Sequence, residues 1–326
     1  MVRDYSSVFD CLVVGSGISG LAASRRLVEA GFSVMVCDKS RGVGGRVASR
    51  RIEGAPFDHG AQFVTRRSAE FSKIVEDLLI EEVVIPWFGE AGKERYAGLP
   101  SMNQIAKTLA EGLDVKRGMR IENVRFCGDY WEVSSEAELV RSRSLLMTCP
   151  APQALDLLKS EATEPSSCVL NTLSKIEYDK GIALMALLKE PFPVSDSGFL
   201  QYDDPEPIAT VADTLKKRGL ESPGVIIQSG PDFAERHFDS NPDTIIECLL
   251  DAYPRSKELK IVSTSLQKWR YAKRREHGIS DSYSSDPSIM LWHAGDGYVA
   301  PKVEGAYLSG LRVAESVAAE LELKLK

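Results

Sequence analysis

The sequence lacks long apolar runs, has few cysteines and histidines, and carries no excess of positive charge. Its longest apolar stretch, residues 182–188, is far shorter than the roughly 20 residues that a membrane-spanning helix needs. The first residues contain no apolar core of the kind that marks a secretory signal. A formal net charge of −7 argues against nucleic-acid binding. These absences predict a cytoplasmic protein that binds neither membrane nor nucleic acid.

The six cysteines and four histidines also lack the spacings of metal and redox motifs. The cysteines lie far apart without a Cys-x-x-Cys pair, which predicts buried, reduced thiols. The histidines show no ligand spacing, so we expect no metal site; they are His59, His237, His277 and His293. Hydrophobic residues make up 43% and charged residues 27% of the 326 positions, which is typical of a globular protein, and the length suggests two domains.

A glycine-rich turn lies between an apolar strand at 11–14 and a helical pattern at 21–30. In such a turn the first glycine permits a tight bend, the second lets the backbone approach a pyrophosphate, and the third lets the helix pack on the strand. The helix N-terminus favours phosphate through its free N–H groups. A bare Gly-x-Gly-x-x-Gly also occurs in ordinary turns, but the flanking strand and helix favour a dinucleotide site. The predicted contacts are Gly15, Gly17, Ile18, Ser19 and Gly20.

A second apolar strand, 33–38, ends in an acid that fits the same site. Asp38 follows Gly20 by 18 residues, close to the roughly 20 expected for an acid that accepts a ribose 2′-OH. This motif alone leaves FAD and NAD open. The loop that follows favours FAD, because Gly44 and Gly45 permit close backbone approach and Arg46 would reach phosphate or flavin.

The C-terminal end of the chain also favours FAD. A strand at 288–292 is followed by Gly295-Asp296 and by a final helix that opens at Val303-Glu304-Gly305-Ala306. We expect Asp296 to accept ribityl or ribose hydroxyls. We expect the helix N-terminus to stabilise negative charge on the reduced flavin. The expected apolar positions of this helix are Tyr307, Leu311, Ala314, Ala318 and Leu321.

Together these motifs resemble the flavin-containing amine oxidase superfamily, and within it the renalases. The matching runs are Gly15–Gly20, Asp38-Lys39, Gly44–Arg46, Phe57-Asp-His-Gly-Ala-Gln62, Thr148–Pro152, Lys268-Trp-Arg270, Gly295–Tyr298 and Val303–Ala306. The resemblance implies that Lys39, Gly60, Ala61 and Gln62 join the cofactor contacts. It implies non-covalent FAD, since the last cysteine, Cys248, precedes the closing flavin segment.

The fold class that this resemblance implies is α/β (α+β). We expect a Rossmann-like FAD-binding domain of the glutathione-reductase/p-hydroxybenzoate-hydroxylase type, with a second, mixed-sheet substrate domain. The expected FAD-binding domain is discontinuous and comprises 1–66, 100–153 and 286–326, and the substrate domain comprises 67–99 and 154–285. Helices are expected from 68, from Ser101 with a Ser101/Gln104 capping box, and from Pro242 with Asn241 as cap. Strands of the second sheet are expected at 182–188, 208–211, 225–229 and 261–270.

Four residues are candidates for contact with the reacting groups: Gln62, Trp269, Arg270 and Tyr298. Gln62 would hydrogen-bond an amide or the flavin edge, Trp269 would stack on a flat ring, and Arg270 would hold a phosphate or carboxamide. Tyr298 would form a wall of the pocket. Each has a structural alternative: core packing for Trp269, an internal ion pair for Arg270 and simple cover of the cofactor for Tyr298. For His59, packing is favoured over acid–base work.

The resemblance implies an FAD-dependent oxidase. Its donor would be a misreduced 2- or 6-dihydro isomer of NAD(P), which passes a hydride to flavin N5, and dioxygen would then give NAD(P)⁺ and hydrogen peroxide. One alternative is a flavin amine oxidase acting on a small amine in an aromatic cage. No lysine matches the one that such oxidases usually place near N5, although Lys268, Lys273 and Lys302 lie in plausible segments. Another alternative is a non-catalytic FAD-binding scaffold or redox sensor.

Overall fold

The computed structural model describes residues 3–159, 165–218, 222–275 and 281–325, which form two compact units. Unit 1 comprises Met1–Gly45, Ala106–Glu177 and Arg274–Lys326, and unit 2 comprises Arg46–Ile105 and Tyr178–Lys273. Segments 46–66 and 100–105, which we expected in the cofactor domain, pack within unit 2, and 154–177 packs within unit 1. The assignment of one unit to the cofactor and the other to the substrate stays a prediction.

Unit 1 is built on a mostly parallel sheet with the strand order β16-β17-β10-β1-β2-β7, from which β8 and β9 branch at β10. Strands β1, β2, β7, β10 and β17 run parallel. The strands are β1 (Arg3–Val14), β2 (Val34–Asp38), β7 (Asp114–Arg117), β8 (Asn123–Phe126), β9 (Trp131–Ser134), β10 (Glu138–Met147), β16 (Ser284–Asp286) and β17 (Leu291–His293). The helices are α1 (Ile18–Glu29), α4 (Ala151–Leu158), α5 (Ser167–Ser174) and α9 (Val303–Leu325), with a 3-10 turn at Pro287–Ile289.

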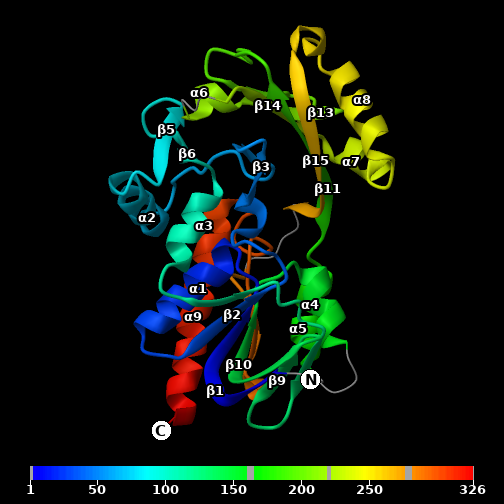
Figure 1. Ribbon diagram of the computed structural model, residues 1–326. Coiled ribbons are helices and arrows are strands. Elements are labelled where there is room, and N and C mark those ends of the chain that lie inside the picture. The colour runs from blue at the N-terminus through cyan, green and yellow to red at the C-terminus, as the bar shows by residue number, and fades with distance from the viewer. Residues whose placement is uncertain (1–2, 160–164, 219–221, 276–280, 326) are drawn as a thin grey trace. The chain divides into compact units, whose positions relative to one another are not determined.

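Helices α1 and α9 pack side by side on one face of this sheet (Figure 1). The buried cluster there joins β1, β2 and β17 to both helices; it includes Val13, Leu27, Val36, Trp292, Val313 and Leu321. The two helices approach closely at Gly310, where a Cβ would lie 2.3 Å from the carbonyl oxygen of Ser19. The contact fixes the start of α1 against α9.

Unit 2 contains a five-stranded sheet with the order β12-β13-β14-β11-β15. Its strands are β11 (Tyr178–Leu188), β12 (Phe199–Gln201), β13 (Ile208–Asp213), β14 (Gly224–Ser229) and β15 (Ile261–Arg274). Two hairpins, β3 (Ser49–Ile52) with β4 (Ala55–Asp58) and β5 (Val84–Phe88) with β6 (Arg95–Gly98), complete the strands. The helices are α2 (Ala69–Ile80), α6 (Thr214–Arg218), α7 (Pro231–His237) and α8 (Pro242–Ala252), with 3-10 turns at Gly45–Val47 and Ser256–Glu258; α3 (Asn103–Ala110) crosses the boundary between the units.

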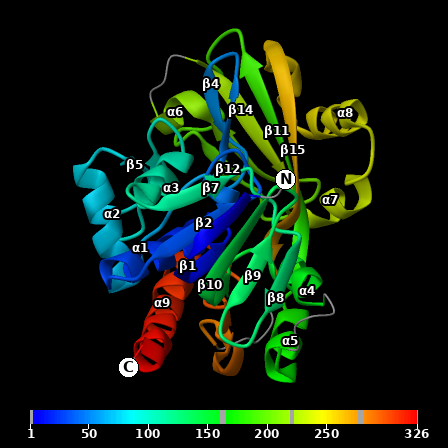
Figure 2. The ribbon, with the colours of Figure 1, turned by 60° about the horizontal axis from the view of Figure 1, so that its bottom comes forward.

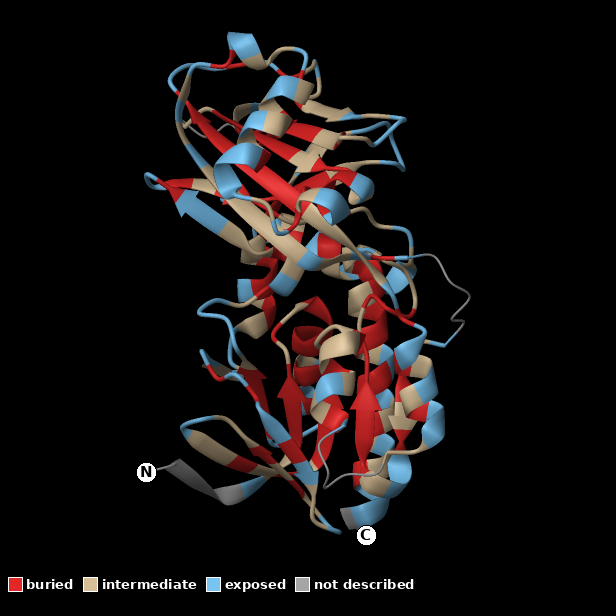
Figure 3. Ribbon diagram, turned by 90° about the vertical axis from the view of Figure 1, so that its right-hand side faces the viewer, coloured by how far each residue is buried: buried red, intermediate tan, exposed pale blue. Residues whose placement is uncertain are grey.

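Both faces of the five-stranded sheet are covered, as the alternation of β11 shows. Ile182, Leu184, Ala186 and Leu188 join the cluster with α7 and α8, which lie beside β11 and β15 in Figure 2. Met185 and Leu187 join a second cluster with β3 and β4. The strand reads as a continuous apolar run because successive side chains enter different cores. Figure 3 shows the resulting buried strands in both units.

The expected fold class is confirmed, with several local corrections. The second sheet was expected to be mixed, but its pairs β12–β13, β13–β14 and β11–β14 are antiparallel. Helix α9 buries Leu308, Val313, Ala314, Val317 and Leu321, whereas Tyr307, Leu311 and Ala318 are half-buried. Of the five expected positions, Ala314 and Leu321 are therefore buried, and the buried face also includes residues next to the other three. No helix of the described residues is long and apolar enough to cross a membrane.

The thiols and the cap of α3 also differ from expectation. All six cysteines are free, as expected, but Cys11 and Cys37 are buried whereas Cys168 is exposed. The Ser101 hydroxyl donates to the side chain of Asn103 instead of accepting from Gln104. The first N–H groups of α3 are held by Asp58 Oδ1 and Ser49 Oγ, at 2.9 and 3.3 Å from the nitrogens of Met102 and Asn103. The helix is thus capped by side chains distant in sequence.

Candidate functional site

The parallel strands of unit 1 bring the predicted dinucleotide contacts to one edge of the sheet. Strands β1, β2, β10 and β17 end at Val14, Asp38, Met147 and His293, and their ladders are in parallel register. Ligands of open α/β sheets bind at the carboxyl ends of the strands. Gly15–Gly20, Asp38 and Gly295-Asp296 all follow strand ends at this edge.

Gly15 and Gly20 are required by the packing of the turn itself. Gly15 has a φ of +117°, which L residues with a side chain rarely adopt. A Cβ on Gly20 would lie 2.0 Å from the carbonyl oxygen of Gly15 and 2.6 Å from Thr148 Oγ1. Thr148 in turn donates to the carbonyl of Gly15 at 3.0 Å. The turn is therefore locked onto the end of β10.

Gly17 differs from these two glycines because no atom of the described residues occupies the space beside it. It is the N-cap of α1, has an ordinary φ of −73°, and a Cβ there would meet nothing within 4 Å. No side chain caps this helix, and its first turn contains no acid. The N–H groups of Ile18, Ser19 and Gly20 thus have no partner within the helix. These features form a cradle that suits the pyrophosphate of a dinucleotide.

Asp38 lies beside the cradle and holds its turn. Its Oδ2 accepts from both the backbone N–H and the hydroxyl of Ser16, each at 2.7 Å, and its Oδ1 accepts from the N–H of Ser40 at 2.7 Å. A carboxylate oxygen accepts about two hydrogen bonds. Oδ1 therefore retains an acceptor position of the kind that a ribose hydroxyl would use.

The glycines after Asp38 pack directly on the turn. Gly44 donates its N–H to the carbonyl of Ser16 at 2.8 Å and pairs with Gly17. A Cβ on Gly45 would lie 3.4 Å from the Cα of Gly17. Lys39 is engaged with Gln153, with its Nζ 3.3 Å from Oε1. The second glycine loop thus packs on the first, and its approach to a cofactor stays a prediction.

The C-terminal segment is positioned by a buried polar network around His293. The imidazole Nδ1 lies 2.8 Å from the Tyr298 hydroxyl, and Nε2 lies 2.9 Å from the carbonyl of Cys149. The same hydroxyl lies 2.7 Å from Ser284 Oγ. Tyr298 is 1% exposed, so the structure places it in the interior. Its role as a wall of the pocket or as cover of the cofactor stays a prediction.

The remaining predicted contacts of this segment lie around the start of α9. Gly295 donates its N–H to Ser309 Oγ at 2.9 Å, and a Cβ on it would meet nothing within 4 Å. Position 305 accommodates only glycine, because a Cβ there would lie 2.2 Å from the carbonyl oxygen of Ala300. Asp296 and Glu304 are both buried, and Val303 and Ala306 lie in the first turn of α9.

Burial of His293 gives a testable pH dependence. Desolvation lowers the pKa of His293 from 6.5 to about 4. Between these values the unfolded chain binds a proton that the folded protein does not, so the free energy of unfolding falls as the pH is lowered from about 6.5 to about 4. At about 1.4 kcal/mol per pH unit this amounts to roughly 3 kcal/mol. Denaturant titrations of the wild type and of His293→Asn should show a shallower pH dependence in the variant; identical slopes would contradict the assignment.

In unit 2, the predicted contacts Arg46, Gly60 and Ala61 come together through their backbones. The N–H of Ala61 donates to the carbonyl of Arg46 at 2.9 Å, and a Cβ on Gly60 would lie 2.0 Å from that same oxygen. The Arg46 guanidinium lies over the ring of Tyr178, 5.6 Å from its centroid. The segment 58–62, which we call the DHGAQ loop, is thus held against the chain at Arg46.

Strand β4 delivers Asp58 to the interior of unit 2. Phe57 packs on the sheet so closely that a Cβ on Gly224 would lie 2.5 Å from its ring. Asp58 is fully buried, and its Oδ1 accepts from Ser49 Oγ at 2.6 Å and from the N–H of Met102 at 2.9 Å. A buried carboxylate requires a compensating cation or neutralisation.

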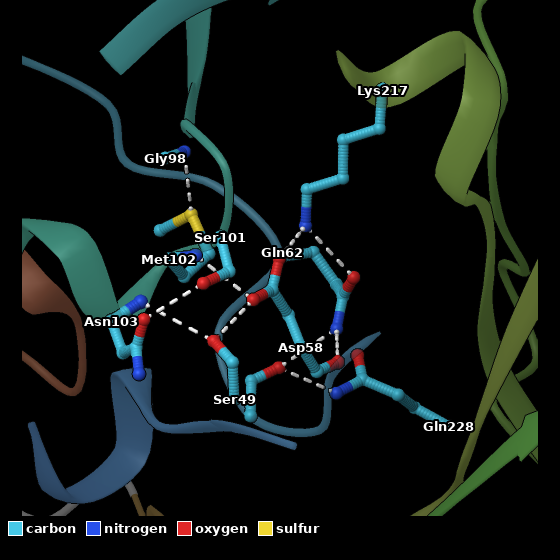
Figure 4. Close-up of polar contacts among 10 residues, drawn as sticks. Ser49, Asp58, Gln62, Gly98, Ser101, Met102, Asn103, Lys217 and Gln228 are labelled. Carbon is cyan, nitrogen blue, oxygen red and sulfur yellow. Dashed lines mark hydrogen bonds and ion pairs between the residues drawn. The ribbon is translucent and has the colours of Figure 1, made fainter. Parts of the chain in front are cut away.

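The cation is Lys217 of helix α6 (Figure 4). Its Nζ lies 2.7 Å from Asp58 Oδ2 and 3.1 Å from Gln62 Oε1, and both side chains of the ion pair are completely buried. Helix α6 is fixed at its start by Asp213, whose Oδ1 accepts from the N–H groups of Leu215 and Lys216. Desolvation lowers the pKa of Lys217 well below 10.5.

Gln62 directs its whole side chain toward this cluster. Its Nε2 donates to the carbonyls of Asp58 and Gly60 at 2.6 and 3.1 Å, while Oε1 accepts from Lys217. The amide thus has no donor left for a substrate amide or the flavin edge. The contacts of the Gln62 side chain lie with the loop and with Lys217. The hydrogen bond predicted between Gln62 and an amide or the flavin edge stays a prediction.

Trp269 and Arg270 do not come together. The Trp269 Nε1 donates to the carbonyl of His59 at 2.8 Å, whereas the Arg270 guanidinium lies over Phe238, 5.1 Å from its ring centroid. Lys268, two residues earlier, bonds the carbonyl of the same Phe238. Successive residues of a strand point to opposite faces. Only Trp269 of this pair lies beside the DHGAQ loop.

His59 lies beside Trp269 with its ring tilted and is neutral at physiological pH. The two ring centroids lie 5.4 Å apart. Burial, with a smaller contribution from the positive charge of Arg50, lowers the pKa of His59 to about 4. Its Nδ1 is buried and has no hydrogen-bond partner among the described residues. Packing, the alternative favoured for this residue, is consistent with these contacts.

An aromatic cluster forms a second feature of unit 2. Trp87, Phe88 and Phe199 lie with their ring centroids 4.9 to 5.5 Å apart, and Phe63 joins them at 5.5 to 6.4 Å. All four residues are half-buried. Lys217 lies over Trp87 on one side, 5.2 Å from its centroid, and Arg95 lies over Phe88 at 5.1 Å. The cluster is a candidate apolar wall for a substrate.

Lys217 is the residue that sequence reasoning missed. It lies 155 residues from Gln62, next to Lys216 and Arg218, in a run that reads as a solvated face. The sequence feature that could have predicted a buried cation is Asp58, because it directly follows the aromatic residue Phe57. A carboxylate that becomes buried needs a cation nearby. Among the described residues, no group of histidines, cysteines or acids is arranged to hold a metal ion.

Comparisons with known proteins support the reading of the N-terminal segment. Residues 13–78 match the family profile of NAD(P)-binding Rossmann-like domains. The chain is 39% identical over 72 residues to putrescine oxidase of Kocuria rosea and 35% identical over 82 residues to L-amino acid dehydrogenase of Synechocystis. These matches span 22% and 25% of this chain, but only 15% and 17% of the lengths of those two proteins.

The fold is shared over nearly the whole chain with solved structures. Cyclohexylamine oxidase from Brevibacterium oxydans superposes with a TM-score of 0.74 at 14% identity, covering 97% of this chain and 100% of that one. At this identity the likeness concerns the fold alone. The chain therefore combines a segment that matches NAD(P)-binding Rossmann-like domains with the α/β fold of an amine oxidase structure.

Proposed function

We propose that the protein is an FAD-dependent oxidase of small organic donors, with amines as the favoured class. The observation that carries the proposal is the cradle in unit 1: the uncapped start of α1, the open side of Gly17 and the acid Asp38 beside it. When bound, the flavin of FAD takes a hydride from a donor and passes the electron pair to dioxygen, which gives hydrogen peroxide.

The residues of unit 1 would bind and orient the cofactor. The N–H groups of Ile18, Ser19 and Gly20 point along α1 toward its positive end and would hold the pyrophosphate. Asp38 Oδ1 would accept a ribose hydroxyl, and Gly44 and Gly45 allow close approach of the chain. Gly295-Asp296 and the start of α9 are the further proposed contacts of unit 1. Contacts by Arg46 and the DHGAQ loop, which belong to unit 2, stay predictions from the sequence. Nothing in this set requires a protein nucleophile.

The proposed donor class rests on two observations. The aligned proteins include a putrescine oxidase and a cyclohexylamine oxidase by name. Unit 2 also carries the half-buried cluster of Phe63, Trp87, Phe88 and Phe199, which suits an apolar donor. Lys217 and Arg95 already place positive charge on these rings, which favours the neutral form of an amine over its ammonium.

A misreduced dihydronicotinamide isomer is the second candidate donor. The half-buried Trp269 beside the DHGAQ loop favours it, because an indole can stack on a flat ring. The position of Arg270 argues against this donor. Arg270 is the cation proposed to bind the dinucleotide, but it lies over Phe238, on the face of β15 opposite to Trp269. A scaffold without turnover would bind FAD and accept electrons from neither class.

Anaerobic reduction separates these functions. The purified protein, titrated with FAD, should bind one equivalent per chain and turn yellow. Putrescine, cyclohexylamine, borohydride-reduced NAD and β-NADH are then mixed with it separately without oxygen. Bleaching by an amine, with peroxide formed on admission of air, is expected; bleaching by the mixed nicotinamide isomers alone would favour the second candidate. A colourless protein that takes up no FAD would overturn the proposal.

A further inference from the structure

We propose that Lys217 is a positioning residue that fixes the backbone of the DHGAQ loop through Asp58 and Gln62. Its side chain has no exposed surface even without a cofactor in place, so it acts through these neighbours and does not touch cofactor or donor. That the loop contacts the flavin rests on the proposed function; that Lys217 fixes the loop does not.

The Lys217 ammonium finds two hydrogen-bond acceptors and an aromatic ring in unit 2. Two of its three hydrogens are directed to Asp58 Oδ2 at 2.7 Å and to Gln62 Oε1 at 3.1 Å, and the charge also lies 5.2 Å from the ring centroid of Trp87. A buried ammonium is tolerated only when it is paired and hydrogen-bonded. The geometry therefore assigns Lys217 to this one cluster.

The lysine and two carbonyls of the loop together set which way the Gln62 amide points. Because Oε1 faces an ammonium, Nε2 must face the carbonyls of Asp58 and Gly60, and both its hydrogens are used there. Without Lys217, the amide has no cation to hold its oxygen. The carbonyls of Asp58 and Gly60 would then accept from a Gln62 amide that is free to rotate.

Three consecutive carbonyls of the loop are held in this way. Asp58 accepts from Gln62, His59 accepts from Trp269 Nε1 at 2.8 Å, and Gly60 accepts from Gln228 Nε2 at 2.7 Å as well as from Gln62. In a trans peptide the C=O of one residue and the N–H of the next point in opposite directions. The N–H groups of His59 and Gly60 therefore point away from the side chains that hold the carbonyls.

This arrangement gives the loop a function that its sequence does not reveal. Gln62 of the loop, with Trp269 and Gln228 of the sheet, holds the backbone, and the N–H groups of His59 and Gly60 are the donors that the backbone would present. Preorganised backbone donors contribute to catalysis because they need no reorganisation during the reaction. The same Asp58 also holds the start of α3 through Met102, so the lysine fixes two segments at once.

The first test uses the protein without added FAD and compares Lys217→Met with Lys216→Met. Lys216 is the exposed neighbour on α6, so the control makes the same chemical change outside the cluster. Hydrogen–deuterium exchange of peptides covering 57–63 is the measurement. We expect exchange at least about tenfold faster in Lys217→Met, which corresponds to easier local opening, and no change in Lys216→Met. Equal exchange in both variants would overturn the proposal.

The second test uses the FAD-loaded protein and the donor found active with the wild type. Misplacement of the loop should lower the maximal rate of anaerobic flavin reduction by about tenfold to a hundredfold, with little change in the donor concentration at half-maximal rate. It should also alter the fine structure of the flavin visible spectrum. An unchanged spectrum and maximal rate would show that Lys217 serves stability alone.

A double variant separates positioning from folding. Asp58→Asn with Lys217→Met removes both charges and keeps an acceptor for Ser49 and Met102. We expect this variant to regain stability yet to retain the fast loop exchange, because Gln62 still lacks its cation. Recovery of wild-type exchange would contradict the proposal. Failure of wild-type protein to bind FAD would overturn the proposed function and leave the exchange test decisive for Lys217.

Discussion

Replacing Gly20 with alanine is expected to unfold unit 1 or leave it insoluble. The added Cβ would lie 2.0 Å from the carbonyl oxygen of Gly15 and 2.6 Å from Thr148 Oγ1. Neither neighbour has room to move, because Thr148 is bonded to the Gly15 carbonyl and Gly310 of α9 packs on Ser19. Overpacking of this kind costs about 3 kcal/mol or more. Thermal unfolding and the soluble yield measure the effect.

Gly17→Ala is the matched control, with the opposite expectation. The protein leaves the space beside Gly17 open, and its φ of −73° suits alanine. The variant should fold with a melting temperature near that of the wild type. It should nevertheless bind FAD at least about tenfold more weakly, a loss of about 1.4 kcal/mol, because the methyl group would occupy the path of the pyrophosphate. Unaltered FAD affinity in a folded Gly17→Ala protein would show that the cradle is not the phosphate site.

These two variants also mark what the sequence can predict about the nucleotide site. The spacing of Gly15, Gly17, Gly20 and Asp38 carries its own geometry, since the strand, the turn and the helix are neighbours in the chain. Local motifs of this kind can be read from one segment. The structure adds which glycine faces the protein and which faces open space, a distinction that depends on Thr148 and on the packing of α9.

The residues of unit 2 were harder to predict because their partners are remote in sequence. Asp58 and Lys217 are separated by 159 positions, and nothing in the sequence distinguishes Lys217 from Lys216 before the fold places one inside. Gln62 was identified, but its side chain points to the loop and not outward. Trp269 and Arg270 could have been separated from sequence alone, since neighbours on a strand face opposite ways.

The contacts of His293 and Tyr298 in unit 1 were also hard to predict from the sequence. Tyr298 follows Gly295-Asp296 by two positions and was expected at a pocket wall, yet it bonds His293 and Ser284 in the interior. An aromatic residue with a hydroxyl serves either role, and burial decides between them. Its partner Ser284 lies on β16, a strand outside the ranges expected from the sequence.

Lys217→Met is expected to lower the free energy of unfolding by about 3 to 5 kcal/mol, the second large effect in this protein. Removing one member of a buried ion pair leaves the other charge without compensation. Here Asp58 would keep the hydrogen bonds that Ser49 and Met102 donate to its Oδ1, but neither donor carries a positive charge. Denaturant unfolding monitored by intrinsic tryptophan fluorescence should report the loss, since Trp87 lies against the lysine.

The double-mutant cycle with Asp58→Asn shows whether the loss comes from the unpaired charge. Replacing both partners removes the buried charges together, and such replacements cost far less than breaking the pair. The double variant should therefore be more stable than Lys217→Met alone, with a favourable coupling energy of about 0.5 to 3 kcal/mol in the wild type. Additive losses in the two single variants would mean that the side chains contribute independently. The loop would then have to be held by Trp269 and Gln228 without help from the ion pair.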